Sequence, residues 1–201
     1  MSRRSVLITA FEPFGVWQSN SARLCLDEVL NQLPDTVDAT ARVYPVDFAA
    51  VRERLAVDLQ EGFDFSVHLG QAQQSGRIRL ESIAINMGCV PGQPEAAFQP
   101  LTAGGPVAYQ STLPLIAWAA MLRAQGIPAY VSYHAGTYLC NAVLYWAHQF
   151  IAERKRATRP CFVHLPLDVG QVISQGTDWP TLPAVVSAKA VCSILREMEQ
   201  L

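Results

Sequence analysis

Long apolar runs and concentrated charge are both missing from this sequence. No stretch approaches the ~20 consecutive apolar residues of a membrane-spanning helix, so we expect no membrane partner. Residues 1–15 contain two arginines and a short apolar run, but no small-residue cleavage site follows, which argues against a signal peptide. We therefore expect a cytoplasmic protein.

Charge is scarce and balanced. Only 16% of the residues are charged, the formal net charge is −2, and no run of like charges occurs. Because binding to phosphates requires a concentrated basic surface, we expect no nucleic acid partner. In contrast, 50% of the 201 residues are hydrophobic, which supplies a substantial core. This length fits a single domain over residues 1–201.

Paired cysteines are also missing. The chain has five cysteines, an odd number, and no CxxC pair: Cys25, Cys89, Cys140, Cys161 and Cys192. This pattern indicates neither a zinc site nor a disulfide framework, and we expect free thiols and no metal. Cys25, Cys161 and Cys192 lie within strand or helix patterns and are expected in the core. Any cysteine function must then come from the surroundings of one thiolate.

Apolar periodicity predicts strands and helices in alternation. Strand patterns cover residues 5–11, 39–46, 64–70, 78–86, 127–133 and 161–166. Helix patterns cover residues 19–33, 47–62, 113–126, 140–154 and 182–201. Residues 87–106 have no periodicity, and loops of such length are usually functional or mobile. The alternation predicts a single-domain, three-layer α/β/α sandwich around a mostly parallel, mixed sheet.

Several details of the helices can be predicted. Ser19 or Asn20 is expected to cap the first helix, with Leu24, Val29 and Leu33 on its inner side. Asp47 is expected to cap the second helix, and Gly62 to stop it. The last helix is expected to bury an apolar stripe of Val185, Ala188, Cys192, Leu195 and Met198.

Three residues with possible chemistry lie in or just after predicted strands, and α/β sheets bind their ligands beyond the carboxyl ends of such strands. Cys140 follows a strand and a short turn and opens a helix, whose N-terminus favours a thiolate. The N–H groups of the same helix end could hold an oxyanion. His164 ends the next strand, and Glu81 is a carboxylate in an otherwise apolar stretch. The three would make a hydrolase triad if they met in space.

Each of these residues also has a structural interpretation, which spacing alone favours. Free cysteine is among the most buried residue types, so Cys140 fits a packed thiol. A lone histidine at a strand end is more often a hydrogen-bonded structural residue, and a glutamate alternating in a strand usually faces solvent. His68 and His148 have no partner pattern and are expected to be structural.

Four short segments change this balance: "FEPFG" at 11–15, "ESIAIN" at 81–86, "AGTYLCN" at 135–141 and "FVHLP" at 162–166. In order and spacing they resemble the pyroglutamyl peptidase I, or pyrrolidone-carboxylate peptidase, family of cysteine peptidases. The resemblance spans nearly the whole chain. It implies an α/β/α sandwich that removes N-terminal pyroglutamate from peptides with a blocked N-terminus. It also implies no metal or cofactor, and a homo-oligomer, either a dimer or a tetramer.

The resemblance also implies roles for individual residues. Cys140 matches the nucleophile, His164 its general base and acid, and Glu81 the acidic partner of the histidine. The substrate-binding positions are aromatic residues around the lactam ring and one amide that could hydrogen-bond it: Phe11, Phe14, Tyr138 and Gln71. An apolar slot of this kind can select an uncharged lactam.

The chain departs from the family pattern near the expected pocket. Ser75 stands where the family has an arginine, and "MGCVPGQPE" after Asn86 lacks the arginine that lies near the cysteine in the family. Tyr133 and His134 replace the usual Asn-Thr. These changes leave an alternative open, a non-catalytic or substrate-shifted relative that binds a small lactam or a peptide N-terminus.

Overall fold

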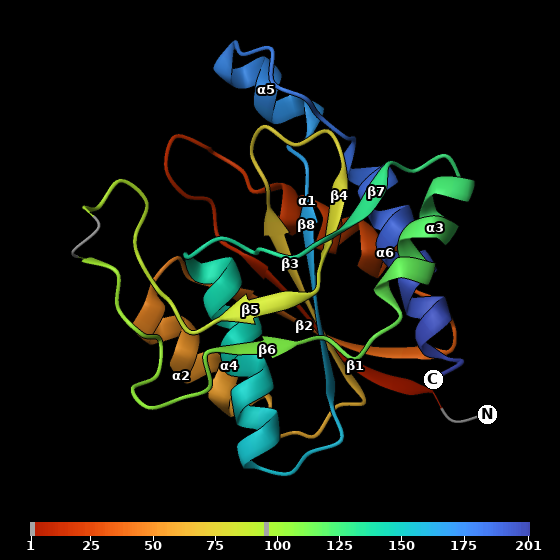
Figure 1. Ribbon diagram of the computed structural model, residues 1–201. Helices are drawn as coiled ribbons and strands as arrows, with labels where there is room; N and C mark the ends of the chain where they lie inside the picture. Colours follow the sequence, from red (N-terminus) through yellow and green to blue (C-terminus); the bar gives the residue numbers. More distant parts are fainter. Residues whose placement is uncertain (1–2, 95–96) are drawn as a thin grey trace.

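The computed structural model describes residues 3–94 and 97–201. Its centre is a six-stranded sheet in the order β2-β1-β3-β8-β4-β7 (Figure 1). The strands of this sheet are β1 (Arg4–Phe11), β2 (Val37–Tyr44), β3 (Phe65–Gln71), β4 (Ile78–Glu81), β7 (Ala129–Ser132) and β8 (Arg159–Leu165). A separate ladder pairs β5 (Ile83–Ile85) with β6 (Ala108–Gln110).

The main sheet is mixed but mostly parallel. Strand β1 pairs in parallel with β2 and β3, and β3 pairs in parallel with β8. Strand β4 runs antiparallel to β8 and carries β7 in parallel at the sheet edge. The predicted fold class is therefore confirmed. The reversal of β4 places its last residues beside the middle of β8.

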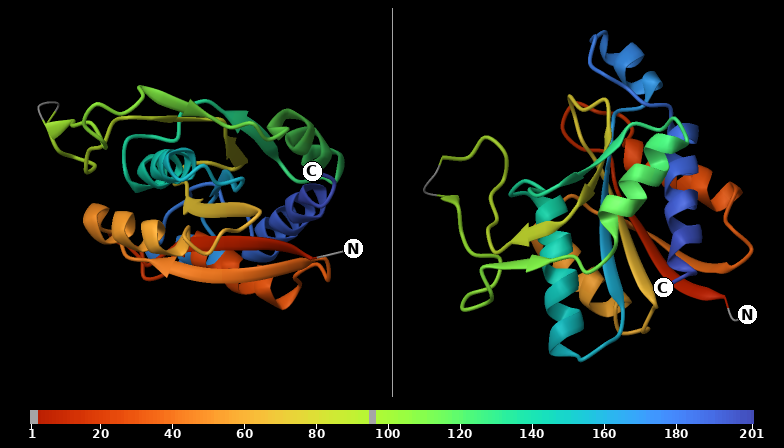
Figure 2. Two further views of the ribbon diagram at one scale, coloured as in Figure 1. Left: turned by 90° about the horizontal axis from the view of Figure 1, so that it is seen from below. Right: turned by 45° about the vertical axis from the view of Figure 1, so that its right-hand side comes forward.

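Helices cover both faces of the sheet. One face carries α1 (Ser21–Asn31), α3 (Leu115–Ala124) and α6 (Ala184–Met198), and the other carries α2 (Phe48–Asp58) and α4 (Leu139–Glu153). The left view of Figure 2 shows this separation, with α2 and α4 on one side of the strands and α3 and α6 on the other. Within β1, Val6 and Ile8 pack into the first layer and Leu7 into the second, as the alternation of a strand requires. None of the described helices is long and apolar enough to cross a bilayer.

The first helix begins as predicted, and two of the three residues expected on its inner side, Val29 and Leu33, pack into the core. The Asn20 side chain accepts the Ala22 N–H at 2.9 Å, which confirms it as the cap. The buried apolar residues are Ala22, Cys25, Leu26 and Val29, at the spacing of one helical face. Leu24 lies off that face and is only partly buried, so its prediction was wrong. Leu33 follows the helix end and packs against the same core.

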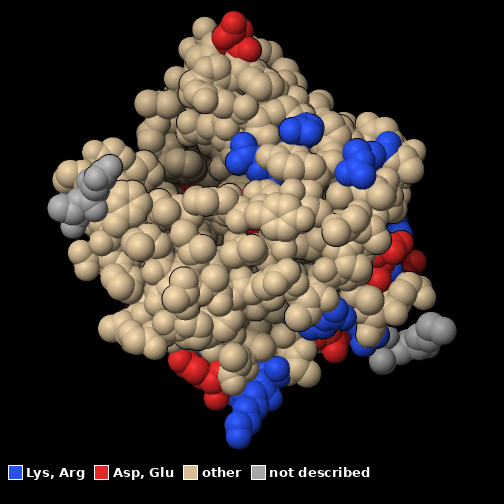
Figure 3. Space-filling model, in the orientation of Figure 1, with Lys and Arg blue, Asp and Glu red and all other residues tan. Residues whose placement is uncertain are grey.

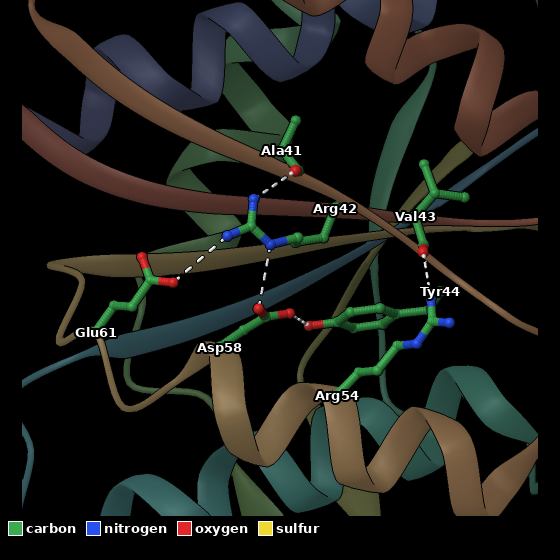
Figure 4. A network of polar contacts seen from close by, with 7 residues as sticks. All are labelled: Ala41, Arg42, Val43, Tyr44, Arg54, Asp58 and Glu61. Carbon is green, nitrogen blue, oxygen red and sulfur yellow. Dashed lines mark hydrogen bonds and ion pairs between the residues drawn. The ribbon is translucent and has the colours of Figure 1, made fainter.

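The second helix is capped by Asp47, which accepts the Ala50 N–H at 2.9 Å, as predicted. It ends at Asp58, before Gly62, where a polar network ties it to β2 (Figure 4). The Tyr44 hydroxyl donates to one Asp58 oxygen at 2.8 Å, and Arg42 Nε donates to the other at 3.1 Å. The buried carboxylate of Asp58 thus has partners on both oxygens, and it fixes the end of the helix against the sheet.

Residues 78–86, predicted as one strand, form two strands in different sheets. The break is at Ser82, whose N–H donates to the Ser132 carbonyl at 2.7 Å and whose own carbonyl accepts from Ser111 at 2.8 Å. Before the break β4 stays in the main sheet; after it β5 lies along α4. Because the chain breaks there, Glu81 is the last residue of β4 and is held next to β8.

Two short elements were not predicted from the sequence, β6 and α5 (Val169–Gln175). Helix α5 starts with a capping box: the Asp168 side chain accepts a backbone N–H of the first turn, and the Gln171 side chain accepts the Asp168 N–H. The helix ends at Gly176, which has a positive φ of 62°. That Asp-x-x-Gln spacing was the signal available in the sequence. Figure 1 shows α5 projecting beyond the upper end of β8.

The remaining predictions concern loop 87–106, the last helix and the cysteines. The described part of the loop is irregular apart from a bridge between Gly88 and Gln99, and residues 95 and 96 lie outside the described residues. In α6 the predicted stripe is buried except for Val185, which is 56% exposed in the first turn. The cysteines are free, and those predicted for the core are buried: Cys25, Cys161 and Cys192.

Candidate active site

Cys140 is the second residue of α4, and its side chain is partly buried. The side chain of the N-cap residue, Tyr138, makes no capping hydrogen bond. The backbone N–H groups of the first turn at the site therefore have no side-chain cap as a partner. The positive end of the helix dipole favours an anion at this position. A thiol placed there is suited to act as a thiolate.

Gly70 of β3 allows the sulfur its position. A Cβ at Gly70 would lie 2.9 Å from Cys140 Sγ and 2.7 Å from Cζ of Phe162, closer than real Cβ contacts. Because glycine has no Cβ, the sulfur can lie directly over the end of β3. Nothing in the sequence around Gly70 indicated this close approach.

His164 and Glu81 form a buried pair beside the cysteine. Nδ1 of His164 lies 2.7 Å from Oε1 of Glu81, and Glu81 is only 1% exposed. Burial on its own would lower the pKa of His164, but the charge of Cys140 and the hydrogen bonds with Cys140 and Glu81 outweigh it and raise the pKa to about 9. Since Nδ1 bonds the carboxylate, Nε2 is the ring nitrogen left for the sulfur. The structure thus brings the three residues together from α4, β8 and β4.

A small pocket, partly open to solvent, lies against the sulfur. Its lining includes every substrate-binding position that the resemblance implied: Phe11, Phe14, Gln71 and Tyr138. Cys140 also lines it, together with three residues that the sequence did not place in a pocket: Asn20, Val46 and Leu139. Tyr138 is held by Phe48, whose ring meets it edge-on at 5.4 Å between centroids. Among the described residues the lining is mainly apolar and has no carboxylate or basic side chain.

The surface around the site carries little charge. In the orientation of Figure 1, a hollow opens in the upper part of the molecule beside the loop between β1 and α1 (Figure 3). Most of the surrounding surface carries no Lys, Arg, Asp or Glu, apart from basic side chains on the right of the hollow. This distribution suits an uncharged ligand group.

A sequence model of the family described as pyroglutamyl peptidase matches residues 4–198. The chain belongs to this family. The pyrrolidone-carboxylate peptidase from Clavibacter michiganensis subsp. michiganensis is 36% identical to it, over 96% of this chain and 91% of that protein. The pyrrolidone-carboxylate peptidase from Thermococcus onnurineus is also 36% identical, over 92% of this chain and 95% of that protein.

Solved structures of the family agree in fold. The pyrrolidone carboxyl peptidase from Fervidobacterium islandicum AW-1 superposes with a TM-score of 0.91 at 30% identity, covering 98% of this chain and 99% of that one. A mutant pyrrolidone carboxyl peptidase from P. furiosus gives a TM-score of 0.87 at 31% identity, covering 98% of each chain. The described elements are therefore those of the pyroglutamyl peptidase fold.

Asn141, next to Cys140, supports the site in a way that the sequence did not indicate. It is fully buried, and its side chain accepts the Ile85 N–H and donates to the carbonyls of Ile85 and Met87, each at 2.9 Å. The Cys89 N–H also donates to the Thr137 carbonyl at 2.8 Å. These bonds hold the start of loop 87–106 against the N-terminus of α4.

The other histidines have structural surroundings. His68 is fully buried, its Nδ1 lies 2.8 Å from the Thr9 hydroxyl, and burial lowers its pKa to about 3. His148 stacks on Tyr109 at 5.5 Å between centroids, and burial lowers its pKa to about 4. His134 is exposed, and its Nδ1 accepts the Gly136 N–H at 2.8 Å in the turn before α4.

Proposed function

We propose that this member of the pyroglutamyl peptidase family removes an N-terminal pyroglutamyl residue from peptides, with Cys140, His164 and Glu81 as its catalytic residues. One observation carries the proposal. The sulfur of Cys140 borders an uncharged aromatic pocket, while His164, bonded to a buried Glu81, has its pKa raised by the same sulfur.

The pocket supports pyroglutamate as the residue that enters it. The pyroglutamyl ring is flat and has no charged amine, so it can enter between Phe11, Phe14 and Tyr138 without loss of ionic hydration. An ordinary N-terminal ammonium would have to be desolvated there, and the lining residues that the structure describes offer it no carboxylate partner, which is costly. Gln71 supplies an amide that can hydrogen-bond the ring.

The reaction begins with the Cys140 thiolate and the His164 imidazolium. The sulfur attacks the pyroglutamyl carbonyl carbon, a C–S bond forms, and the carbonyl oxygen takes the negative charge beside the N–H groups at the start of α4. When the intermediate collapses, the C–N bond breaks and His164 gives its proton to the leaving nitrogen. The products are a peptide with a new free amine and a thioester on Cys140.

Hydrolysis of the thioester completes the cycle. A water molecule gives a proton to the now neutral His164 as its oxygen attacks the thioester carbonyl. The C–S bond then breaks, and pyroglutamic acid leaves with the thiolate and imidazolium restored. Glu81 keeps the ring oriented by accepting from Nδ1–H and stabilises the imidazolium, as the acid does in other triads.

The test compares Cys140→Ala with Cys89→Ala, a buried thiol outside the pocket lining. Hydrolysis of a pyroglutamyl-coupled chromogenic amide should be lost in Cys140→Ala and kept in Cys89→Ala, with both variants folded. Iodoacetamide should label Cys140 faster than the other thiols because it is the thiolate of the site. Unchanged turnover in Cys140→Ala would refute the mechanism. Tight lactam binding without turnover in the unmodified protein would instead favour the non-catalytic relative.

A further inference from the structure

The orientation of the Gln71 amide in the pocket follows from its partners. Its Oε1 accepts two hydrogen bonds, from the Ser21 N–H at 2.9 Å and from Gln171 Nε2 at 2.8 Å. A backbone N–H can only donate, so the oxygen of Gln71 has to face Ser21. The amide nitrogen of Gln71 must then lie on the other side, and it has no hydrogen-bond partner among residues 3–94 and 97–201.

Gln171 is itself held in one orientation. Its Oε1 accepts the Asp168 N–H at 2.9 Å, and its Nε2 donates to the Ser19 carbonyl at 2.8 Å as well as to Gln71. A backbone donor on one side and a backbone acceptor on the other exclude a flipped amide. The side chain is only 2% exposed, so water does not compete for these bonds.

We propose that Gln171 is a positioning residue that holds the NH2 group of Gln71 toward the pocket, so that the site reads the ring carbonyl of the lactam. Gln71 is 7% exposed and lines the pocket, and an unpaired buried donor there favours a ligand that brings an acceptor. Pyroglutamate has a ring carbonyl and proline does not, so proline would leave the donor unpaired. This inference rests on the proposed function and deepens it.

A purely structural role for Gln171 is the competing explanation, because it also completes the capping box of α5. Two variants separate the explanations. Gln171→Glu keeps the oxygen that accepts the Asp168 N–H but places a second oxygen against Gln71 Oε1. Gln171→Met removes both polar atoms and leaves the Ser21 N–H to hold Gln71. If Gln171 positions the amide, Glu is the more damaging substitution; if it only caps α5, Met is.

The experiment measures KM and kcat for a pyroglutamyl chromogenic amide and inhibition by 2-pyrrolidone, a simple lactam. We expect Gln171→Glu to raise KM and the inhibition constant by about tenfold or more, with a smaller change in kcat and a smaller effect from Gln171→Met. Gln175→Glu is the matched control: Gln175 also lies in α5 and also donates from Nε2 to a backbone carbonyl, that of Val16. It should leave KM unchanged. A KM increase at least as large in Gln171→Met as in Gln171→Glu would overturn the proposal.

A second variant keeps the test decisive if Gln171→Glu does not fold. Gln71→Glu retains an oxygen for both internal donors and changes the pocket-facing group from donor to acceptor. It should weaken 2-pyrrolidone binding as strongly as Gln171→Glu. If Gln71→Glu binds 2-pyrrolidone as well as the unmodified protein does, the inference fails.

Protection of Cys140 from iodoacetamide by 2-pyrrolidone separates this inference from the proposed function, because it does not depend on turnover. Protection in the unmodified protein that is lost in Gln71→Glu supports the inference even if no peptide is cleaved. No protection in the unmodified protein overturns it, even if the chromogenic amide is cleaved.

Discussion

Gly70→Ala should disable the site through one methyl group. The added Cβ would lie 2.7 Å from Phe162 Cζ and 2.9 Å from Cys140 Sγ. Ordinary heavy-atom contacts are about 3.5–4.0 Å, so the ring and the sulfur would have to move by roughly 1 Å between them. Gly70 does not have a positive φ, so the backbone itself accepts alanine and the whole effect comes from these contacts.

A displacement of this size has a calculable consequence for catalysis and stability. Misplacing a reacting group by about 1 Å can lower the rate on the order of 100-fold, and overpacking a core typically costs about 1–3 kcal/mol. We therefore expect kcat/KM for a pyroglutamyl amide to fall by about that factor, with slower alkylation of Cys140 and a lower Tm. The expected effect on rate exceeds what the stability loss explains, because the variant should remain folded at the assay temperature.

The assay compares steady-state kinetics, iodoacetamide labelling and thermal unfolding for Gly70→Ala and Gly76→Ala. Gly76 is the control because its added Cβ would meet only Pro180 Cβ, at 3.3 Å, away from the triad. It should keep its activity within about threefold, the range of an ordinary surface substitution. If Gly70→Ala also keeps its activity and its Tm, the sulfur does not depend on the close approach at β3, and our account of the site geometry is wrong.

Two further predictions concern the His164–Glu81 pair and Asn141. The pKa of His164 is raised from 6.5 to about 9, so the stabilisation from its charged form should be complete below pH 6.5 and disappear as the pH rises toward 9, as Tm measured against pH can show. Glu81→Gln should lower this pKa, so that the alkaline decline of kcat/KM moves to lower pH; an unmoved decline would contradict the role of Glu81. Asn141→Ala should lower the free energy of unfolding by about 2–4 kcal/mol, measured with denaturant, because it leaves three backbone groups of β5 and loop 87–106 without their partner. Asn141→Asp keeps the acceptor for the Ile85 N–H but turns a second, buried oxygen toward the carbonyls of Ile85 and Met87, so it should lose at least as much; a clearly smaller loss would contradict this account.

Local chemistry made much of the chain predictable. Asn20 and Asp47 cap their helices because a short oxygen-bearing side chain before an amphipathic run can accept an N–H of the first turn. The alternation of strand and helix patterns predicted the layered fold. The triad was a different case: spacing alone favoured structural roles for Cys140, His164 and Glu81, and only resemblance in four short segments indicated chemistry.

Local patterns failed where partners far along the chain decide the outcome. The alternation over 78–86 is the same whether the residues form one strand or two, and the division at Ser82 depends on bonds to Ser132 and Ser111. Leu24 and Val185 are apolar residues on helices, but which side of each helix faces the core depends on the packing of α1 against α6 and on the surrounding layers. The short helix α5 has too few residues for a visible period.

The sequence by itself determined the order of most of the elements, two of the helix caps and the candidate residues of the site, because these depend on the identities of near neighbours. Only the tertiary structure decided how the site is arranged. It brings Glu81 to His164 across 83 positions and Gln171 to Gln71 across 100, and it brings the sulfur of Cys140 over Gly70. The direction of a hydrogen bond and the space for a sulfur atom are properties of groups that meet only when the chain is folded.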